Sequence, residues 1–177
     1  MSEVKYHEPK AYISAAEISA RVREIAEKIN AYYGMEELTV ICTLKGSVIF
    51  FTDLIRHLRM PVVCEFLGTS SYGNQATSSG EIKMTLDVNE PLVGRNVLIV
   101  EDIVDTGLTL QYLVNHLKLR NPLSLRTAAL LYKPAALKAK DLVIHEIGFE
   151  IPNKFVVGYG LDYAEKFRAL PYIGVIE

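Results

Sequence analysis

The apolar positions near the amino terminus repeat at helical spacing. Apolar side chains occur where they share one face of an α-helix, namely at Ile18, Val22, Ile25, Ala26 and Ile29. Ser14 and Glu17 precede this stretch with the spacing of a capping box, in which each side chain bonds the other residue's backbone N–H. Gly34 follows the last apolar turn, where a glycine commonly ends a helix. The pattern predicts one amphipathic helix between these two signals.

Shorter apolar runs follow, and many are rich in the β-branched residues that favour strands. They cover residues 38–44, 62–67, 82–86, 97–100, 125–131 and 155–161. Residues 48–58 and 108–119 lie between some of them and have helical periodicity. Strands that alternate with helices favour a mainly parallel, twisted sheet with helices on both faces. We therefore predict a single α/β domain over residues 1–177, whose short C-terminal segment packs on the sheet or over the functional site.

A polar segment interrupts this pattern between residues 69 and 80. Ten of its twelve residues are Ser, Thr, Gly, Asn or Gln. Such a composition offers few side chains that could pack against a core. We predict that the segment is a mobile loop.

Composition and charge exclude several classes of protein. The chain has 19 basic and 21 acidic residues, a net charge of -2 and no long block of one sign, which argues against a nucleic-acid partner. No apolar run approaches the roughly 18 residues that a membrane span needs, and the polar amino terminus does not resemble a secretory signal. We expect a cytoplasmic protein that binds a small molecule. Cys42 and Cys64 lie in apolar runs without metal-ligand spacing, and we expect buried, reduced thiols.

Acidic and phosphate-binding residue types gather directly after the apolar run 97–100. The cluster contains Glu101, Asp102, Asp105, Thr106, Gly107 and Thr109. Open α/β sheets bind ligands at the carboxyl ends of their strands, and a helix N-terminus presents N–H groups to phosphate. Three carboxylates would repel a phosphate unless ribose hydroxyls donate to Glu101 and Asp102, or Mg²⁺ bridges carboxylate and phosphate oxygens. The cluster predicts a site for a sugar phosphate with Mg²⁺. An acidic helix start that only complements the helix dipole is the simpler alternative.

Two common nucleotide motifs are excluded. Asn74 and Gln75 stand where a Walker loop requires Lys and Ser or Thr. Gly158 and Gly160 begin a dinucleotide-type pattern, but Tyr163 stands where its third glycine should be. The phosphate site is therefore of another kind.

The stretch VLIVEDIVDTGLTL, residues 97–110, resembles the signature with which type I phosphoribosyltransferases bind phosphoribosyl pyrophosphate (PRPP). It is most similar to the hypoxanthine-guanine branch of that family. Further motifs fall in the family's order: residues 44–47, 71–73 and 155–163, with Lys133 and Arg168. The resemblance implies the type I phosphoribosyltransferase fold. In it, a small hood built from the C-terminal segment, possibly with the N-terminal segment, covers the carboxyl ends of the central strands.

The resemblance also implies an activity. The 5-phosphoribosyl group of PRPP would pass to N9 of hypoxanthine or guanine, giving IMP or GMP and pyrophosphate. Mg²⁺ would be the cofactor, and the enzyme would be a homodimer or homotetramer without a nucleic-acid or membrane partner. Two alternatives stay open: a preference for xanthine, and a PRPP-sensing regulator that binds nucleic acid.

The family's PRPP contacts can be carried onto matching residues. The 5′-phosphate loop would consist of Asp105, Thr106, Gly107, Leu108 and Thr109, with leucine where some relatives carry lysine. Glu101 and Asp102 would bind the ribose hydroxyls and, with Asp162, the metal. Asp105 would also be the catalytic group, exchanging a proton at N7 of the purine.

The remaining contacts concern pyrophosphate, base and lid. Lys45, Gly46 and Arg168 would bind pyrophosphate, with a Leu44–Lys45 peptide that can be cis in the family. Lys133 would donate to the O6 and N7 edge of a 6-oxopurine, while Phe155 would stack on the ring, the Val156 backbone would read its edge and Asp162 would lie nearby. Ser71 and Tyr72 would belong to a lid. Taken alone, Lys45 is also consistent with a solvated surface lysine, and Phe155 with a core aromatic.

Overall fold

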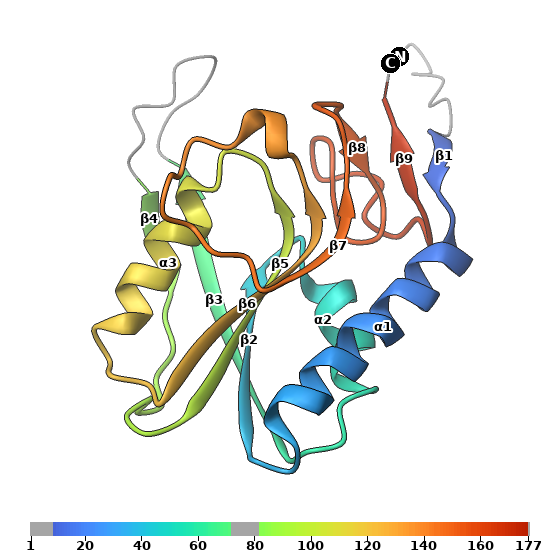
Figure 1. Ribbon diagram of the computed structural model, residues 1–177. Helices are drawn as coiled ribbons and strands as arrows, with labels where there is room; N and C mark the ends of the chain where they lie inside the picture. Colours follow the sequence, from blue (N-terminus) through green and yellow to red (C-terminus); the bar gives the residue numbers. More distant parts are fainter. Residues whose placement is uncertain (1–8, 72–81, 177) are drawn as a thin grey trace.

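The computed structural model describes residues 9–71 and 82–176 and consists of two sheets with three α-helices (Figure 1). Its elements are, in chain order, β1 (Lys10–Ile13), α1 (Ala15–Tyr33), β2 (Leu38–Leu44), α2 (Val48–Ile55), β3 (Val62–Ser71), β4 (Ile82–Leu86), β5 (Asn96–Val104), α3 (Leu108–Lys118), β6 (Ser124–Tyr132), a 3₁₀ turn (Pro134–Ala136), β7 (Glu146–Glu150), β8 (Val156–Val157) and β9 (Ile173–Val175). The predicted alternation of strands and helices is confirmed.

The central sheet has the strand order β4-β3-β2-β5-β6-β7. Every neighbouring pair from β3 to β7 is parallel, whereas β4 runs antiparallel to β3. The segment between β3 and β4 has ten residues, fewer than a crossover between parallel strands needs. The sheet is therefore mainly parallel, as predicted, with one antiparallel edge strand.

Strand β5 shows why the central strands are continuously apolar. Leu98 and Val100 point into the core formed with α1 and α2, while Val97 and Ile99 point into the core formed with α3. Successive side chains of a strand alternate between faces, and both faces of this sheet are covered. The strand places its carboxyl end, where the acidic cluster begins, in the middle of the molecule.

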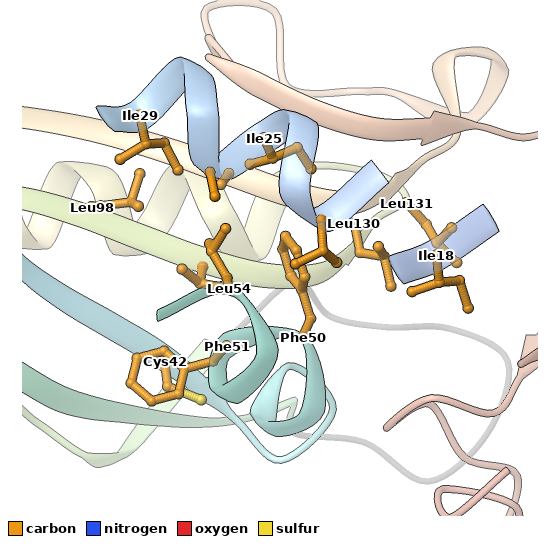
Figure 2. Packing of buried hydrophobic residues seen from close by; sticks show 14 of the residues in the cluster. Ile18, Ile25, Ile29, Cys42, Phe50, Phe51, Leu54, Leu98, Leu130 and Leu131 are labelled. Carbon is orange, nitrogen blue, oxygen red and sulfur yellow. The ribbon is translucent and has the colours of Figure 1, made fainter. Parts of the chain in front are cut away.

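Helix α1 follows its predicted signals closely. Ser14 and Glu17 form the capping box, with Ser14 N–H donating to Glu17 at 2.8 Å and Glu17 N–H donating to Ser14 Oγ at 3.3 Å. Gly34 ends the helix with a φ of 60°. Figure 2 shows the apolar side of α1, with Ile25 among its labelled residues, facing Phe50 of α2 and the central strands. Burial of each such side chain stabilises the fold by about 1.5 to 3 kcal/mol.

A second, three-stranded sheet is built from both ends of the chain. Its order is β1-β9-β8, with antiparallel pairing throughout. It lies beside the carboxyl end of the central sheet (Figure 1). The hydroxyl of Tyr159, two residues after β8, donates to Asp53 of α2 at 2.6 Å and ties this region to the larger part of the molecule. The second sheet thus brings residues 155–168 next to the central strands.

The structure corrects several expectations about element boundaries. Residues 155–161 are not one strand of the central sheet, because β8 ends at Val157 and Gly158, Tyr159 and Gly160 all have positive φ. Helix α2 ends at Ile55 instead of residue 58, and residues 69–71 extend β3 instead of starting a loop. Strand β7 was not predicted, because its five residues include two glutamates and form no apolar run.

Two further observations concern the cysteines and the membrane. Cys42 is buried and free as expected, whereas Cys64 is free but exposed, so the expectation of a buried thiol is wrong for Cys64. None of the helices formed by residues 9–71 and 82–176 is long and apolar enough to cross a membrane.

Candidate active site

The acidic cluster begins inside β5, not beyond it. The strand extends to Val104, so that Glu101 pairs with Ala129 of β6 and Val104 pairs with Tyr132. The sequence had suggested that the strand ends at residue 100, because charged residues are unfavourable in a buried strand. Here the polar residues form the last part of the strand, which fixes their backbone more firmly than a loop would.

The turn from β5 into α3 forms a small phosphate-sized hollow. It has a volume of about 90 Å³ and is lined mainly by the predicted loop, including Asp105, Thr106, Gly107 and Thr109. Gly107 caps α3 with a φ of 77° and supplies no side-chain acceptor, so the first N–H groups of the helix remain available to a ligand. A side chain at Gly107 would also overlap Leu137.

Leu108 does not line this hollow. Its side chain is partly exposed at 42%, and its N–H lies 3.5 Å from Thr106 Oγ1. A lysine at position 108 would add a cation, whereas this chain has an uncharged leucine there. The hollow therefore offers N–H groups, hydroxyls and the helix dipole to a ligand.

Glu101 and Asp102 are held in a buried environment. Burial, reinforced by the neighbouring Asp102 charge, raises the pKa of Glu101 to about 8, and burial raises the pKa of Asp102 to about 6. The hydroxyl of Thr43, at the end of β2, donates to the Glu101 carboxylate. Thr43 was not predicted as a site residue, because 58 positions separate it from Glu101 and no local motif marks the pair. These buried carboxylates need hydroxyl donors or a cation to be stable in the charged form.

The loop after β2 passes directly over Asp102. A Cβ at Gly46 would overlap the Asp102 carboxylate, and a Cβ at Gly160 would overlap the carbonyl oxygen of Gly46. Gly160, Gly46 and Asp102 therefore lie one on another in van der Waals contact, and only glycine fits at positions 46 and 160. The Leu44–Lys45 peptide is cis, in agreement with the family pattern. This packing brings the loop, β5 and the segment after β8 together.

Asp105 and Lys133 form an ion pair, which the sequence around neither residue indicated. Lys133 Nζ lies 3.0 Å from Asp105 Oδ2, and Lys133 N–H donates to the Val104 carbonyl at 2.9 Å. The Lys133 side chain is only 8% exposed, whereas that of Asp105 is 47% exposed. A nearly buried ammonium thus stands beside a carboxylate that remains accessible to a ligand.

A second charged group surrounds Arg168. Its Nη2 lies 2.8 Å from Asp162 Oδ1 and 3.3 Å from Glu165 Oε2, and its Nη1 donates to the Gly160 carbonyl at 2.8 Å. Lys45 Nζ lies 3.1 Å from Glu165 Oε1, which places the two predicted pyrophosphate cations on one carboxylate. The hydrogen bond from Lys45 and, to a smaller extent, that from Arg168 lower the pKa of the Glu165 carboxyl. Glu165 is therefore charged at neutral pH. No local pattern marks Glu165 as a site residue, since it lies 120 residues from Lys45.

Two of the predicted base contacts, Phe155 and Val156, lie at the second sheet. Phe155 is 53% exposed and meets Tyr163 edge to face, with ring centroids 5.6 Å apart. It is therefore not a core aromatic, and its ring is accessible to a planar ligand. Val156 is buried in β8 and pairs with Val175 of β9. Ser71 is the last residue of β3, and Tyr72 lies outside the described residues.

The acidic side chains suit a metal that arrives with a ligand. Across residues 9–71 and 82–176, no three potential metal-ligating side chains come together as a self-sufficient site. Asp102 and Asp162 are close enough for the charge of one to raise the pKa of the other. Mg²⁺ commonly takes one or two carboxylates together with substrate phosphates and water. The residues present fit that arrangement.

The geometry is suited to a ligand with two anionic ends and a polar middle. One end of the site is the helix hollow, the other is the group of Lys45 and Arg168, and the carboxylates of Glu101 and Asp102 lie on the connecting strand. The Asp105–Lys133 pair offers a proton acceptor and a cation to a further polar ligand. The fold and this arrangement of charged and polar groups are those of an α/β protein that binds phosphorylated sugars.

Comparison with known proteins identifies the family. A family model described as the phosphoribosyl transferase domain matches residues 11–164, and the chain belongs to this family. A hypoxanthine-guanine phosphoribosyltransferase of Bacillus subtilis is 44% identical over 174 residues, covering 98% of this chain and 96% of the relative. One from Mycobacterium bovis is 47% identical over 171 residues, covering 93% and 84%. A crystal structure of the Bacillus anthracis enzyme is 43% identical, covers 96% of this chain and 100% of the other, and superposes with a TM-score of 0.90.

Proposed function

We propose that this chain transfers the 5-phosphoribosyl group of PRPP to N9 of hypoxanthine or guanine, giving IMP or GMP and pyrophosphate. The observation that carries the proposal is the Asp105–Lys133 pair, 3.0 Å apart, directly beside the helix hollow. A phosphate site alone fits many enzymes. A buried cation and an accessible carboxylate next to it match the O6 and N7 edge of a 6-oxopurine, which presents an acceptor at position 6. The family and the names of its relatives support this choice of substrates.

Binding of PRPP would use both anionic ends of the site. The 5′-phosphate would lie in the hollow at the start of α3, with Thr106 and Thr109 as hydroxyl donors. The ribose hydroxyls would donate to Glu101 and Asp102. The diphosphate would lie against the loop at Gly46, with Lys45 and Arg168 as cations.

Mg²⁺ carried by the diphosphate would be held from the protein side by Asp102 and Asp162, and would neutralise part of the leaving charge. Glu101 would face the ribose and not the metal, because its carboxylate is buried and accepts the hydrogen bond of the Thr43 hydroxyl. Lys45 and Arg168 would stabilise the charge that develops as the C1′–oxygen bond breaks.

The base would enter between the second sheet and β6. Phe155 would offer its exposed ring for stacking, and the backbone of Val156 would read the edge of the base. Lys133 would donate to O6, and Asp105 would accept or return the proton at N7 while N9 bonds to C1′. Asp105 and Lys133 directly follow the paired strands β5 and β6, and their positions at these strand ends support this division of roles.

A panel of bases tests the proposed substrate class. Hypoxanthine, guanine, xanthine, adenine and uracil are each incubated with PRPP and Mg²⁺, and nucleotide products are separated by chromatography. We expect IMP and GMP to form at rates at least about tenfold above the adenine and uracil products. A dominant xanthine product would favour the xanthine alternative. Absence of any nucleotide would favour the regulator, which a nucleic-acid binding titration would then detect.

The molar mass of the protein in solution, measured by sedimentation, tests the expected homodimer or homotetramer.

Replacement of Lys133 by alanine is expected to relax discrimination between 6-oxo and 6-amino purines. A hydrogen bond from a charged donor contributes about 1.5 to 3 kcal/mol, so the ratio of kcat/KM for hypoxanthine over adenine should fall by roughly tenfold or more. Lys138→Ala is the matched control, since Lys138 is exposed and follows the same 3₁₀ turn. An unchanged ratio in Lys133→Ala would assign position 6 to another group.

Replacement of Gly160 by alanine is expected to displace the loop at Gly46 and weaken PRPP binding. The new Cβ would overlap the Gly46 carbonyl, and a shift of about 1 Å near a site can cost up to 100-fold. We expect kcat/KM for PRPP to fall at least tenfold. Gly94→Ala is the control, because Gly94 also has positive φ, at 71°, but nothing lies within 4 Å of its would-be Cβ. Equal losses in both variants would show that backbone strain alone is responsible.

A further inference from the structure

Glu165 contacts both cations to which we assign the diphosphate. Its two carboxylate oxygens accept from Lys45 Nζ at 3.1 and 3.2 Å, and Oε2 also accepts from Arg168 Nη2 at 3.3 Å. A carboxylate presents two oxygens to these donors much as one phosphoryl group of a diphosphate would. The side chain thus resembles part of the ligand that Lys45 and Arg168 would bind.

The local backbone directs Glu165 toward these cations. Ala164, Glu165 and Phe167 all have positive φ, at 50°, 63° and 73°, which is unusual for residues other than glycine. The N–H of Glu165 donates to Asp162 Oδ2 at 2.8 Å and closes the turn. Three such residues in one short segment require compensation from their surroundings, and Lys45 and Arg168 supply part of it.

We propose that Glu165 is an internal competitor of the diphosphate, which has to displace this carboxylate before it can bind Lys45 and Arg168. This inference rests on the proposed function, because it takes these cations as the diphosphate site. Pyrophosphate release would proceed in the reverse order, with the Glu165 carboxylate returning to the two cations as the product leaves. Glu165 would thereby limit affinity for the diphosphate and favour its release.

Glu165 can be displaced without disordering the rest of the site. Its side chain is 66% exposed, so the free carboxylate would be hydrated by water at little cost. Arg168 has other anchors, since it also bonds Asp162 at 2.8 Å and the Gly160 carbonyl at 2.8 Å. Loss of the Glu165 carboxylate therefore removes a competitor and leaves Arg168 in place.

The charge balance predicts which anion is preferred. A diphosphate carries several negative charges and a carboxylate carries one, so the diphosphate gains more from two cations. Each exposed ion pair shifts an equilibrium by about 1.4- to 5-fold. Two such pairs, with Lys45 and Arg168, together shift it by about 2- to 25-fold. Removal of the competing carboxylate should therefore tighten diphosphate binding within this range, by about three- to tenfold.

Calorimetric titration of inorganic pyrophosphate in the presence of Mg²⁺ tests the proposal. The variants are Glu165→Gln, which keeps the shape of the side chain, and Glu37→Gln, which makes the same change in net charge. Glu37 is exposed and lies just before β2, at the end of the central sheet away from the site. We expect Glu165→Gln to bind pyrophosphate three- to tenfold more tightly than the wild type and to have a lower KM for PRPP. The KM for hypoxanthine should not change, and Glu37→Gln should match the wild type.

The outcomes separate this inference from the proposed function. Equal or weaker pyrophosphate binding by Glu165→Gln, with a wild type that binds pyrophosphate and forms IMP, would show that Glu165 supports the cations instead of competing for them. A wild type that neither binds pyrophosphate nor forms a nucleotide would overturn the proposed function as well. Tighter binding in both Glu165→Gln and Glu37→Gln would assign the effect to net charge and overturn the role of Glu165.

Discussion

Asp105→Asn is expected to lower kcat by about 100-fold while the protein stays folded. Asparagine has nearly the same shape as aspartate but cannot accept a proton from N7, and loss of a general acid or base typically costs 10²- to 10⁴-fold. The measurement is kcat for IMP formation at saturating PRPP and hypoxanthine, with the melting temperature of each variant. Asp141→Asn is the matched control, because Asp141 is exposed and lies outside the proposed site. A change below twofold would remove Asp105 from the catalytic role.

The ion pair between Asp105 and Lys133 requires one more control. Asparagine at position 105 leaves a nearly buried ammonium without its carboxylate, which by itself could misplace Lys133. A double-mutant cycle with Lys133→Ala separates the two effects. If Asp105 only positions Lys133, the double variant should have the kcat of Lys133→Ala. If Asp105 exchanges the proton, the double variant should lose a further factor that approaches 100.

Removal of divalent metal is expected to abolish turnover without changing the stability of the free protein. The described residues offer carboxylates to a metal that arrives with PRPP but no self-sufficient metal site. Excess chelator should therefore reduce IMP formation by at least about 100-fold, and added Mg²⁺ should restore it. The melting temperature of the protein without PRPP should stay within about one degree. Turnover that persists in chelator would contradict the proposed use of Asp102 and Asp162.

Much of the fold could be predicted from local sequence because its causes are local. The capping box at Ser14 and the apolar face of α1 involve residues a few positions apart. The continuous apolar run in β5 reflects burial on both faces of a parallel sheet. In contrast, the second sheet joins residues 10–13, 156–157 and 173–175, and such short segments gain their structure only by pairing with one another.

The same distinction applies to the site. The turn from Asp105 to Gly107 is one contiguous motif, so the sequence showed it directly. The partners of these residues come from distant parts of the chain: Thr43 bonds Glu101, and Glu165 bonds Lys45, with no local pattern that marks either pair. Positions that require glycine, such as Gly160, become evident only when the contact with the Gly46 carbonyl is visible.

The most direct test of the central claim is the stoichiometry of the complete reaction. Purified protein is incubated with hypoxanthine, PRPP and Mg²⁺, and IMP and pyrophosphate are quantified in the same samples over time. We expect IMP and pyrophosphate to appear one to one, and only when all three components are present. Pyrophosphate released without IMP, or no product in the complete mixture, would contradict phosphoribosyl transfer to the base at this site.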